Sequence, residues 1–262
     1  MFVLDGEIGY TEMYSGVIIF LEYGNLYILK HLIRQVNIYN YCIGGEVMLS
    51  KAHEFDEIAN GPFFPIYPVI AQQILEKTGV NKGVCIDIGS GGGHLGLFLA
   101  KITQMDMLLL DKREEALSIA AKRADNWGLS ERTATVLGDV QAMPLQDESV
   151  DLCISRGSVW FWEDQRKGFE EICRVLKKDG VAYIGGGFGT GELKQQVDKK
   201  MKERDSEWPR SREKFVDGND VEHFTKIMNE IGISNFEICD DEKGIWVIFK
   251  KNGEGEKRCM QA

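Results

Sequence analysis

A run of apolar residues passes directly into a run of glycines at residues 84–93, which read VCIDIGSGGG. The apolar part, Val84 to Ile88, predicts a buried strand. The glycines from Gly89 to Gly93 predict a tight turn that a ligand can approach closely, because glycine has no side chain and adopts positive φ angles. Nucleotide-binding folds of several chemistries use such a turn. The turn therefore predicts a ligand site without identifying the ligand.

From Lys82 onward, short apolar runs alternate with longer helical patterns. This alternation predicts a parallel sheet whose strands are connected by crossover helices. The predicted central strands are Gly83–Ile88, Met107–Leu110, Thr133–Leu137, Val150–Ser155 and Val181–Ile184. The predicted crossover helices are His94–Thr103, Arg113–Trp127 and Gln165–Leu176. We expect Gly180 to end the last of these helices, because lysines and then a turn glycine follow its apolar face.

The C-terminal part follows a different pattern. Asp220 to Ile231 predicts an amphipathic helix, and two short strands are predicted after it at Ser234–Cys239 and Ile245–Lys250. The connection between these strands is so short that they must be antiparallel. The predicted fold is therefore α/β, with a doubly wound, mostly parallel seven-stranded sheet that ends in an antiparallel hairpin.

These patterns predict one catalytic domain at residues 48–251 and a flexible tail at 252–262. Two segments of the domain lack the alternation. Residues 52–66 contain aromatics interrupted by prolines, and residues 189–219 carry dense mixed charge without a clear apolar face. We predict that both cover the carboxyl ends of the strands, where loops position substrates. For residues 189–219 the alternative is a solvated helix that only decorates the fold.

Residues 1–47 form an N-terminal extension with two interpretations. Gly16 to Ile33 is apolar but contains Glu22 and Lys30, whereas a spanning helix needs about 20 predominantly apolar residues. The first charges of the chain are acidic, unlike those of a signal peptide. The extension is then either an extra packed segment or upstream sequence ahead of a native start at Met48. Mass spectrometry of the native N-terminus distinguishes the two.

The composition is that of an ordinary globular protein, with 44% apolar and 27% charged residues. The net charge of -10 disfavours nucleic acid as a partner, because Lys and Arg supply most of the affinity for phosphates. Six cysteines show no pairing or metal-binding pattern, which is typical of a cytoplasmic protein. The composition thus favours a small-molecule substrate, no metal and no membrane, and it leaves the oligomeric state open.

Two acidic residues mark the ends of neighbouring strands. Asp111 follows the second strand, where an acid accepts hydrogen bonds from both hydroxyls of an adenosine ribose. Asp87 ends the first strand, where it would repel the pyrophosphate of a dinucleotide but pair with the methionyl ammonium of S-adenosylmethionine. The helix that begins at His94 favours the methionyl carboxylate. The alternative role of Asp87 is a cap of the turn or helix.

Four segments in this order resemble the successive motifs of class I S-adenosylmethionine-dependent methyltransferases of the small-molecule type. They are Val84–Gly93, Leu108–Lys112, Gly138–Val140 with Met143–Leu145, and Ser149–Leu152. The match covers Phe55 to Lys251. The resemblance implies a Rossmann-like fold and S-adenosyl-L-methionine as the methyl donor.

By this resemblance Asp139 accepts from the adenine amine, Val140 and Lys112 sandwich the ring, and Ser155 and Arg156 line the methionyl side. The implied cofactor contacts are Asp87, Ile88, Gly89, Ser90, Gly91, Asp111, Lys112, Asp139, Val140, Ser155 and Arg156. The Asn-Pro-Pro-Tyr motif that would indicate a nitrogen acceptor is absent from the position after the fourth strand. The sequence therefore identifies neither the acceptor nor the catalytic residues.

Aromatic residues gather in two places. Trp160, Phe161 and Trp162 follow the fourth strand, and Phe63, Phe64 and Tyr67 precede a helix predicted at Val69–Lys77. As a group they predict a roof over the pocket, because aromatic faces attract a sulfonium; packing in the core is the alternative. The alternatives to methylation of a small molecule are methylation of protein or RNA, dinucleotide-dependent oxidation, and binding of the cofactor without turnover.

Overall fold

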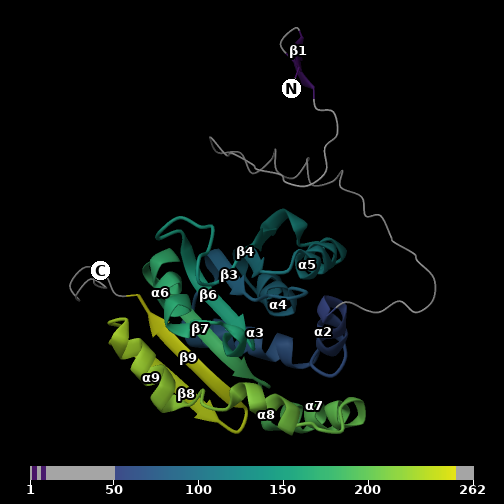
Figure 1. Cartoon of the computed structure of the whole chain (residues 1–262), viewed down its shortest axis with the longest axis vertical. Coiled ribbons are helices and arrows are strands. Elements are labelled where there is room, and N and C mark those ends of the chain that lie inside the picture. Colours follow the sequence, from purple (N-terminus) through teal and green to yellow (C-terminus); the bar gives the residue numbers. More distant parts are fainter. Residues whose placement is uncertain (1, 5–6, 10–50, 252–262) are drawn as a thin grey trace. The chain divides into compact units, whose positions relative to one another are not determined.

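The structure is a computed structural model that describes residues 2–4, 7–9 and 51–251 (Figure 1). The chain divides into two units, residues 1–47 and 48–262. In the first unit, β1 (Phe2–Leu4) pairs antiparallel with β2 (Glu7–Gly9). The predictions for Gly16 to Ile33, for a native start at Met48 and for the tail lie outside the described residues.

The second unit is built on a seven-stranded sheet with the order β5-β4-β3-β6-β7-β9-β8. Strands β5, β4, β3, β6 and β7 run parallel, whereas β9 pairs antiparallel with both β7 and β8. This arrangement confirms the predicted α/β fold with its C-terminal hairpin. The strands are β3 (Lys82–Ile88), β4 (Gln104–Asp111), β5 (Thr133–Leu137), β6 (Val150–Arg156), β7 (Leu176–Gly187), β8 (Phe236–Asp241) and β9 (Gly244–Lys250).

Helices cover both faces of this sheet (Figure 1). Helices α3, α4 and α5 pack into the hydrophobic core on one face, and α6 and α9 pack into the core on the other. Within the described residues, no helix has the length and apolar character needed to cross a membrane. The helices are α2 (Lys51–Asn60), α3 (Ile66–Thr78), α4 (His94–Ile102), α5 (Glu114–Asn126), α6 (Gln165–Val175), α7 (Gly191–Arg204), α8 (Arg210–Val216) and α9 (Val221–Glu230), with short 3-10 turns η1 (Ser130–Arg132) and η2 (Val159–Phe161).

The central strands supply alternate side chains to the two cores. In β3, Cys85 packs with α3, α4 and α5, whereas Ile86 packs with α6 and α9; Leu109 and Leu110 of β4 divide in the same way. Successive side chains of a strand point to opposite faces of the sheet. A strand that is buried on both faces therefore reads as a continuous apolar run, which is the pattern by which these strands were predicted.

The predicted helix end at Gly180 is wrong. Helix α6 ends at Val175, and Leu176 already pairs with β6 as the first residue of β7. Asp179 and Gly180 pair with Lys251 instead of ending a helix: the Asp179 amide donates to the Lys251 carbonyl, and the Lys251 amide donates to the Gly180 carbonyl, both at 2.9 Å. The left-handed backbone position is Asp179, with φ 66°, and not the glycine.

The two segments predicted as covers are largely helical. Residues 52–66 form most of α2 and the turn that leads into α3, and α3 begins at Ile66 rather than at Val69. The segment 189–219 forms α7 and α8. Val197 and Met201 of α7 are buried in the core, so this segment has the apolar face that its sequence did not reveal.

Candidate active site

A cavity of about 830 Å³ lies at the carboxyl ends of the parallel strands. One wall comes from the residues that end or follow β3, β4, β5 and β6, and from the last residues of β7. The remaining walls come from α2, from the start of α3, from η2, and from α7 and α8. Ligands of open α/β sheets bind at this edge, where the strand order reverses on either side of β3.

The glycine turn forms the floor of this cavity. Gly89, Gly91 and Gly93 have φ angles of 67°, 54° and 79°, which favour glycine. A Cβ atom on Gly89 would lie 2.3 Å from the Cβ of Ser158, so the turn packs tightly below. A Cβ atom on Gly91 would meet nothing within 4 Å. The space beside Gly91 is therefore part of the cavity and is not filled by other residues.

Asp87 lies beneath the turn and is 2% exposed. Its Oδ2 accepts a hydrogen bond of 2.9 Å from the amide of Gly96, in the first turn of α4. Burial, together with the nearby charge of Asp111, raises the pKa of Asp87 to about 7 although the Gly96 amide opposes this rise. Asp87 thus holds α4 with one oxygen, as the capping alternative predicts, and it also lines the cavity.

Asp111 connects the end of β4 to the glycine turn. Its Oδ2 accepts from the Gly91 amide at 2.9 Å, and its Oδ1 accepts from the amide and Nε of Arg113 at 3.0 and 3.2 Å. The side chain is nearly buried and lines the cavity. An ionised carboxylate offers about four acceptor sites, so a further donor would take the place of the Arg113 side chain, whose contacts are long at 3.2 Å on Oδ1 and 3.5 Å on Oδ2.

Asp139, Val140 and Lys112 lie together on the same side of the cavity. Oδ1 of Asp139 accepts from the amide of Gln141 at 2.8 Å and from its side chain at 3.1 Å. The amide of Gln141 is the main cause that lowers the pKa of Asp139. Asp139 is therefore ionised and fixed in orientation before any ligand binds.

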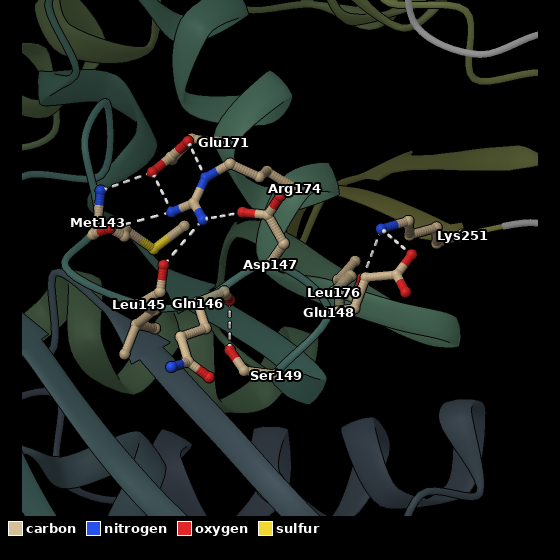
Figure 2. A network of polar contacts seen from close by, with 10 residues as sticks. All are labelled: Met143, Leu145, Gln146, Asp147, Glu148, Ser149, Glu171, Arg174, Leu176 and Lys251. Atoms are coloured by element: carbon tan, nitrogen blue, oxygen red, sulfur yellow. Dashed lines mark hydrogen bonds and ion pairs between the residues drawn. The ribbon is translucent and has the colours of Figure 1, made fainter. Parts of the chain in front are cut away.

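Arg174 fixes the loop that follows Asp139 and Val140 (Figure 2). Its guanidinium donates to the carbonyls of Met143 and Leu145 at 3.0 and 2.8 Å, and it pairs with Glu171 and Asp147 at 2.6 and 2.5 Å. Glu171 in turn accepts from the Met143 amide at 2.8 Å. These carboxylates raise the pKa of Arg174. The loop that carries one wall of the cavity is thus held to α6 through main-chain contacts.

The two residues predicted on the methionyl side differ in their positions. Ser155 is fully buried and does not line the cavity; its Oγ lies 2.6 Å from Oγ of Ser158, which does. Arg156 lines the cavity, donates through Nε and Nη2 to the Gly187 carbonyl at 3.2 and 3.1 Å, and lies 4.6 Å from the ring centroid of Phe63. The cavity side of this segment is therefore made by Arg156 and Ser158.

Most of the predicted aromatic roof lines the cavity. Trp160, Phe161 and Trp162 from η2 and its C-terminal end do so, as do Phe63 and Tyr67. Phe64 does not: it packs against His94 and Phe98. Phe64 is 37% exposed, so it belongs neither to the roof nor to the buried core.

Sequence reasoning missed a polar network that connects α2 to the glycine turn. Arg123 of α5 donates to the Gly92 carbonyl and to Oδ2 of Asp56, the latter at 2.9 Å. Asn60 bonds the ring of His94 at 2.8 Å. Burial, with the charge of Arg123, lowers the pKa of His94 to about 4, so this histidine is neutral at pH 7. The network joins helices α2, α4 and α5, which are far apart in sequence, so no spacing could have revealed it.

The sequence predicts residues 189–219 as a cover, but it does not predict which residues of α7, of α8 and of the turn between them line the cavity. Trp208, Ser211 and Arg212 line the cavity there, together with Met201 and Asp205. Their only signal in the sequence is a tryptophan within a charged segment.

Comparison with known proteins identifies the family. A model of the methyltransferase domain matches residues 80–243. The solved structure of a protein from Methanococcus maripaludis, described as an S-adenosyl-L-methionine-dependent methyltransferase, is 39% identical, with a TM-score of 0.75. The match covers 81% of this chain and 99% of that protein.

Two curated relatives show similarity over shorter parts. Malonyl-[acyl-carrier protein] O-methyltransferase of Methylococcus capsulatus is 37% identical over 36% of this chain and 34% of the relative. Human arginine-hydroxylase NDUFAF5 is 26% identical over 68% of this chain and 52% of the relative. The chain thus spans about a third to a half of the length of these curated relatives.

The chain belongs to the methyltransferase domain family and is of the class I type that depends on S-adenosylmethionine. This membership decides against the dinucleotide-dependent alternative.

The residues of the cavity fit this cofactor. Space is open above Gly91. The Ser90 hydroxyl oxygen is buried without a hydrogen-bond partner among the described residues. Asp87, Asp111 and Asp139 present three separate carboxylates to the cavity. One ammonium, a ribose diol and an adenine amine are the donors that such acceptors would bind.

Proposed function

We propose that this chain transfers the methyl group of S-adenosylmethionine to a small molecule. The observation that carries the proposal is the continuity of the cavity. One space of about 830 Å³ reaches from the glycine turn and its acids to a second wall that contains Trp208 and, from α8, Arg212. Ligand pockets of about 300 to 1,000 Å³ hold small molecules, so this space suits a cofactor with a small acceptor beside it.

The strand ends supply the cofactor contacts in this proposal. Asp111 accepts from the ribose hydroxyls, and Asp139 accepts from the adenine amine between Val140 and the stem of Lys112. Asp87 pairs with the methionyl ammonium, beside Ile88, Gly89, Ser90 and Gly91 of the turn. Arg156 lies on the methionyl side, and Ser155 acts there only through Ser158. Support comes from the position of ten of these eleven residues in the cavity wall, Ser155 being the exception.

The cofactor, when bound, supplies a methyl group on a sulfonium, which is already a good leaving group. The chain's own contribution is alignment and exclusion of water. Proximity and orientation account for about 7 to 11 kcal/mol of a barrier. Trp160, Trp162 and Tyr67 present aromatic faces to the cavity, and such faces stabilise a cation by about 0.5 to 2 kcal/mol each.

Two further features support a small acceptor in the cytoplasm. Helices α2 and α8 both contribute to the cavity wall, so a protein or RNA strand would have to reach past them. Cys85, Cys153, Cys173 and Cys239 are free thiols. Burial raises the pKa of Cys85 and Cys153 well above their usual range, so these thiols are unreactive.

Two experiments test the proposal. Calorimetry with S-adenosylhomocysteine and with NAD should show binding of the first alone. Incubation of the protein with methyl-tritiated S-adenosylmethionine and a cell extract separated by ultrafiltration should then label the small-molecule fraction. Label in the protein or RNA fraction instead would overturn the small-molecule acceptor. Binding of S-adenosylhomocysteine with no label in any fraction would favour a module that holds the cofactor without turnover.

A further inference from the structure

Two arginines line the cavity on the side away from Asp111 and Asp139. Arg156 ends β6 and is bonded to the end of β7, so in the sheet order it lies across β3 from those two acids. Arg212 comes from α8. Both guanidiniums face the same ring: the Cζ atoms of Arg156 and Arg212 lie 6.0 and 5.0 Å from the ring centroid of Phe188. The two cations therefore form one positively charged corner of the cavity.

The acids close to Arg212 are occupied by other donors. Asp198 accepts from Nζ of Lys194 at 2.6 Å and from the indole of Trp208 at 2.8 Å. Asp205 accepts from the Ser211 hydroxyl and from a main-chain amide. Among the described residues, the Arg212 side chain makes no hydrogen bond and no ion pair. Its guanidinium lies against the ring of Phe188 and is attracted by the charge of Asp198 without a bond to it.

Arg156 is also without a carboxylate partner in the described part of the chain. Its guanidinium contacts the Gly187 carbonyl and the Tyr67 hydroxyl, which are both uncharged. Burial first, and then the charge of Arg212, lowers the pKa of Arg156. Burial also lowers the pKa of Arg212, although the charges of Asp198 and Glu213 oppose this change. Both half-buried arginines thus lack a hydrogen-bonded carboxylate partner among the described residues.

Arg174 shows what a fully paired arginine looks like in this protein (Figure 2). Two carboxylates and two carbonyls surround its guanidinium. Arg123 likewise pairs with Asp56. Burying a charge is costly unless it is paired. The unpaired corner at Arg156 and Arg212 is therefore a place where a ligand, rather than the protein, supplies the negative charge.

We propose that the methyl acceptor carries a carboxylate or a phosphate group, which binds Arg212 beside Arg156. The inference rests on the proposed function and names its substrate class. A guanidinium matches these anions with two parallel hydrogen bonds. Trp160, Phe63 and Trp208 line the same cavity and would contact the apolar body of the acceptor. The anion thereby fixes which atom of the acceptor faces the methyl group.

The test measures binding of simple probes to the complex with S-adenosylhomocysteine. Benzoate and phenyl phosphate carry the anion on an aromatic ring, and benzamide is the neutral counterpart of benzoate. By calorimetry or ligand-observed NMR, at least one anion should bind roughly tenfold or more tightly than benzamide, as charge-assisted hydrogen bonds require. Which of the two anions binds more tightly assigns carboxylate or phosphate.

Arg212→Gln should abolish this preference while S-adenosylhomocysteine binds as before, and Arg212→Lys should retain part of it. Arg210→Gln is the matched control, because Arg210 is exposed on the same helix and does not line the cavity. Equal binding of anions and benzamide to the unaltered protein would overturn the inference, as would a preference that survives Arg212→Gln. The comparison of the two anions with benzamide in the unaltered protein tests the inference even if a variant fails to fold. Failure of the unaltered protein to bind S-adenosylhomocysteine would instead overturn the proposed function.

Discussion

The two ends of the cavity are built differently. At the end formed by the parallel strands, Asp87, Asp111 and Asp139 each follow or end a strand, and each accepts a hydrogen bond from a main-chain amide. At the other end, Trp208 and Arg212 come from the segment of α7 and α8, and the Arg212 side chain makes no hydrogen bond or ion pair within the described residues. A site on strand ends is fixed by the sheet itself, whereas a site on covering helices varies independently of the fold. This difference explains why the family is evident and the acceptor is not.

The largest expected effect comes from filling the cavity at the glycine turn. Gly91→Val should weaken S-adenosylhomocysteine binding by roughly a hundredfold or more, because the side chain enters the open space above the turn and the backbone has φ 54°. Calorimetry measures this loss. Gly79→Val is the matched control: Gly79 has φ 67° and equally open surroundings, but it lies outside the cavity. It should lower stability by about 1 to 2 kcal/mol and leave binding intact.

Removal of Asp111 should have the next largest effect. Asp111→Ala leaves the ribose hydroxyls and the Gly91 amide without their acceptor, which costs about 1 to 3 kcal/mol, or roughly 5- to 150-fold in the dissociation constant of S-adenosylhomocysteine. Asp111→Asn keeps one acceptor oxygen and should lose less. Asp106→Ala, an exposed change in the same strand, should lose nothing. An unchanged dissociation constant in Asp111→Ala would remove this residue from the site.

A smaller effect concerns pH. The pKa of Asp87 is raised to about 7, whereas a bound ammonium requires the ionised form. Affinity for S-adenosylhomocysteine should therefore rise with pH up to about 7, by at most about tenfold per unit, and then level off. The same raised pKa favours the folded state most at low pH, and this contribution is lost as the pH rises through 7. In Asp87→Asn, calorimetry should show a flat pH profile; a profile like that of the unaltered protein would contradict the assignment.

The smallest expected effect is a change in protection of the covering segments. With S-adenosylhomocysteine bound, residues 52–66 should exchange amide hydrogens more slowly, since α2 lines the cavity and is bonded to the glycine turn through Arg123. Hydrogen exchange with and without the ligand measures this. Residues 189–219 should gain protection only when an acceptor is present as well. Protection confined to the glycine turn would separate these segments from cofactor binding.

The end of the cavity formed by the parallel strands could be predicted because the local sequence determines its strand, its turn and its acidic residues. A strand buried on both faces must be apolar, and the turn beyond it needs glycine where φ is positive, as at Gly89 and Gly91. Asp111 could be predicted in the same way, because it ends the next apolar strand along the chain. Those constraints act within a few residues, so a single sequence displays them.

At the other end, the sequence predicts residues 189–219 as a cover but not the residues that line the cavity, because their contacts are between segments that are distant in sequence. Val197 and Met201 bury one face of α7, but lysines and glutamates surround them and hide the apolar pattern. The prediction of a helix end at Gly180 is wrong for a related reason. The lysines before it suit a helix end, yet they belong to β7, in which Asp179 and Gly180 are bonded to Lys251. In both cases tertiary contacts overrode a local pattern.

The bonds of Arg123 have a consequence for the timing of the reaction. Helix α2 reaches the glycine turn through Arg123, which holds Asp56 and the Gly92 carbonyl at once. We expect the exchange of used for fresh cofactor to open and close this ion pair in every cycle. We expect the departure of S-adenosylhomocysteine, rather than methyl transfer, to set the turnover number. A burst of product in the first turnover, followed by a slower steady rate that depends on solvent viscosity, would be its kinetic signature.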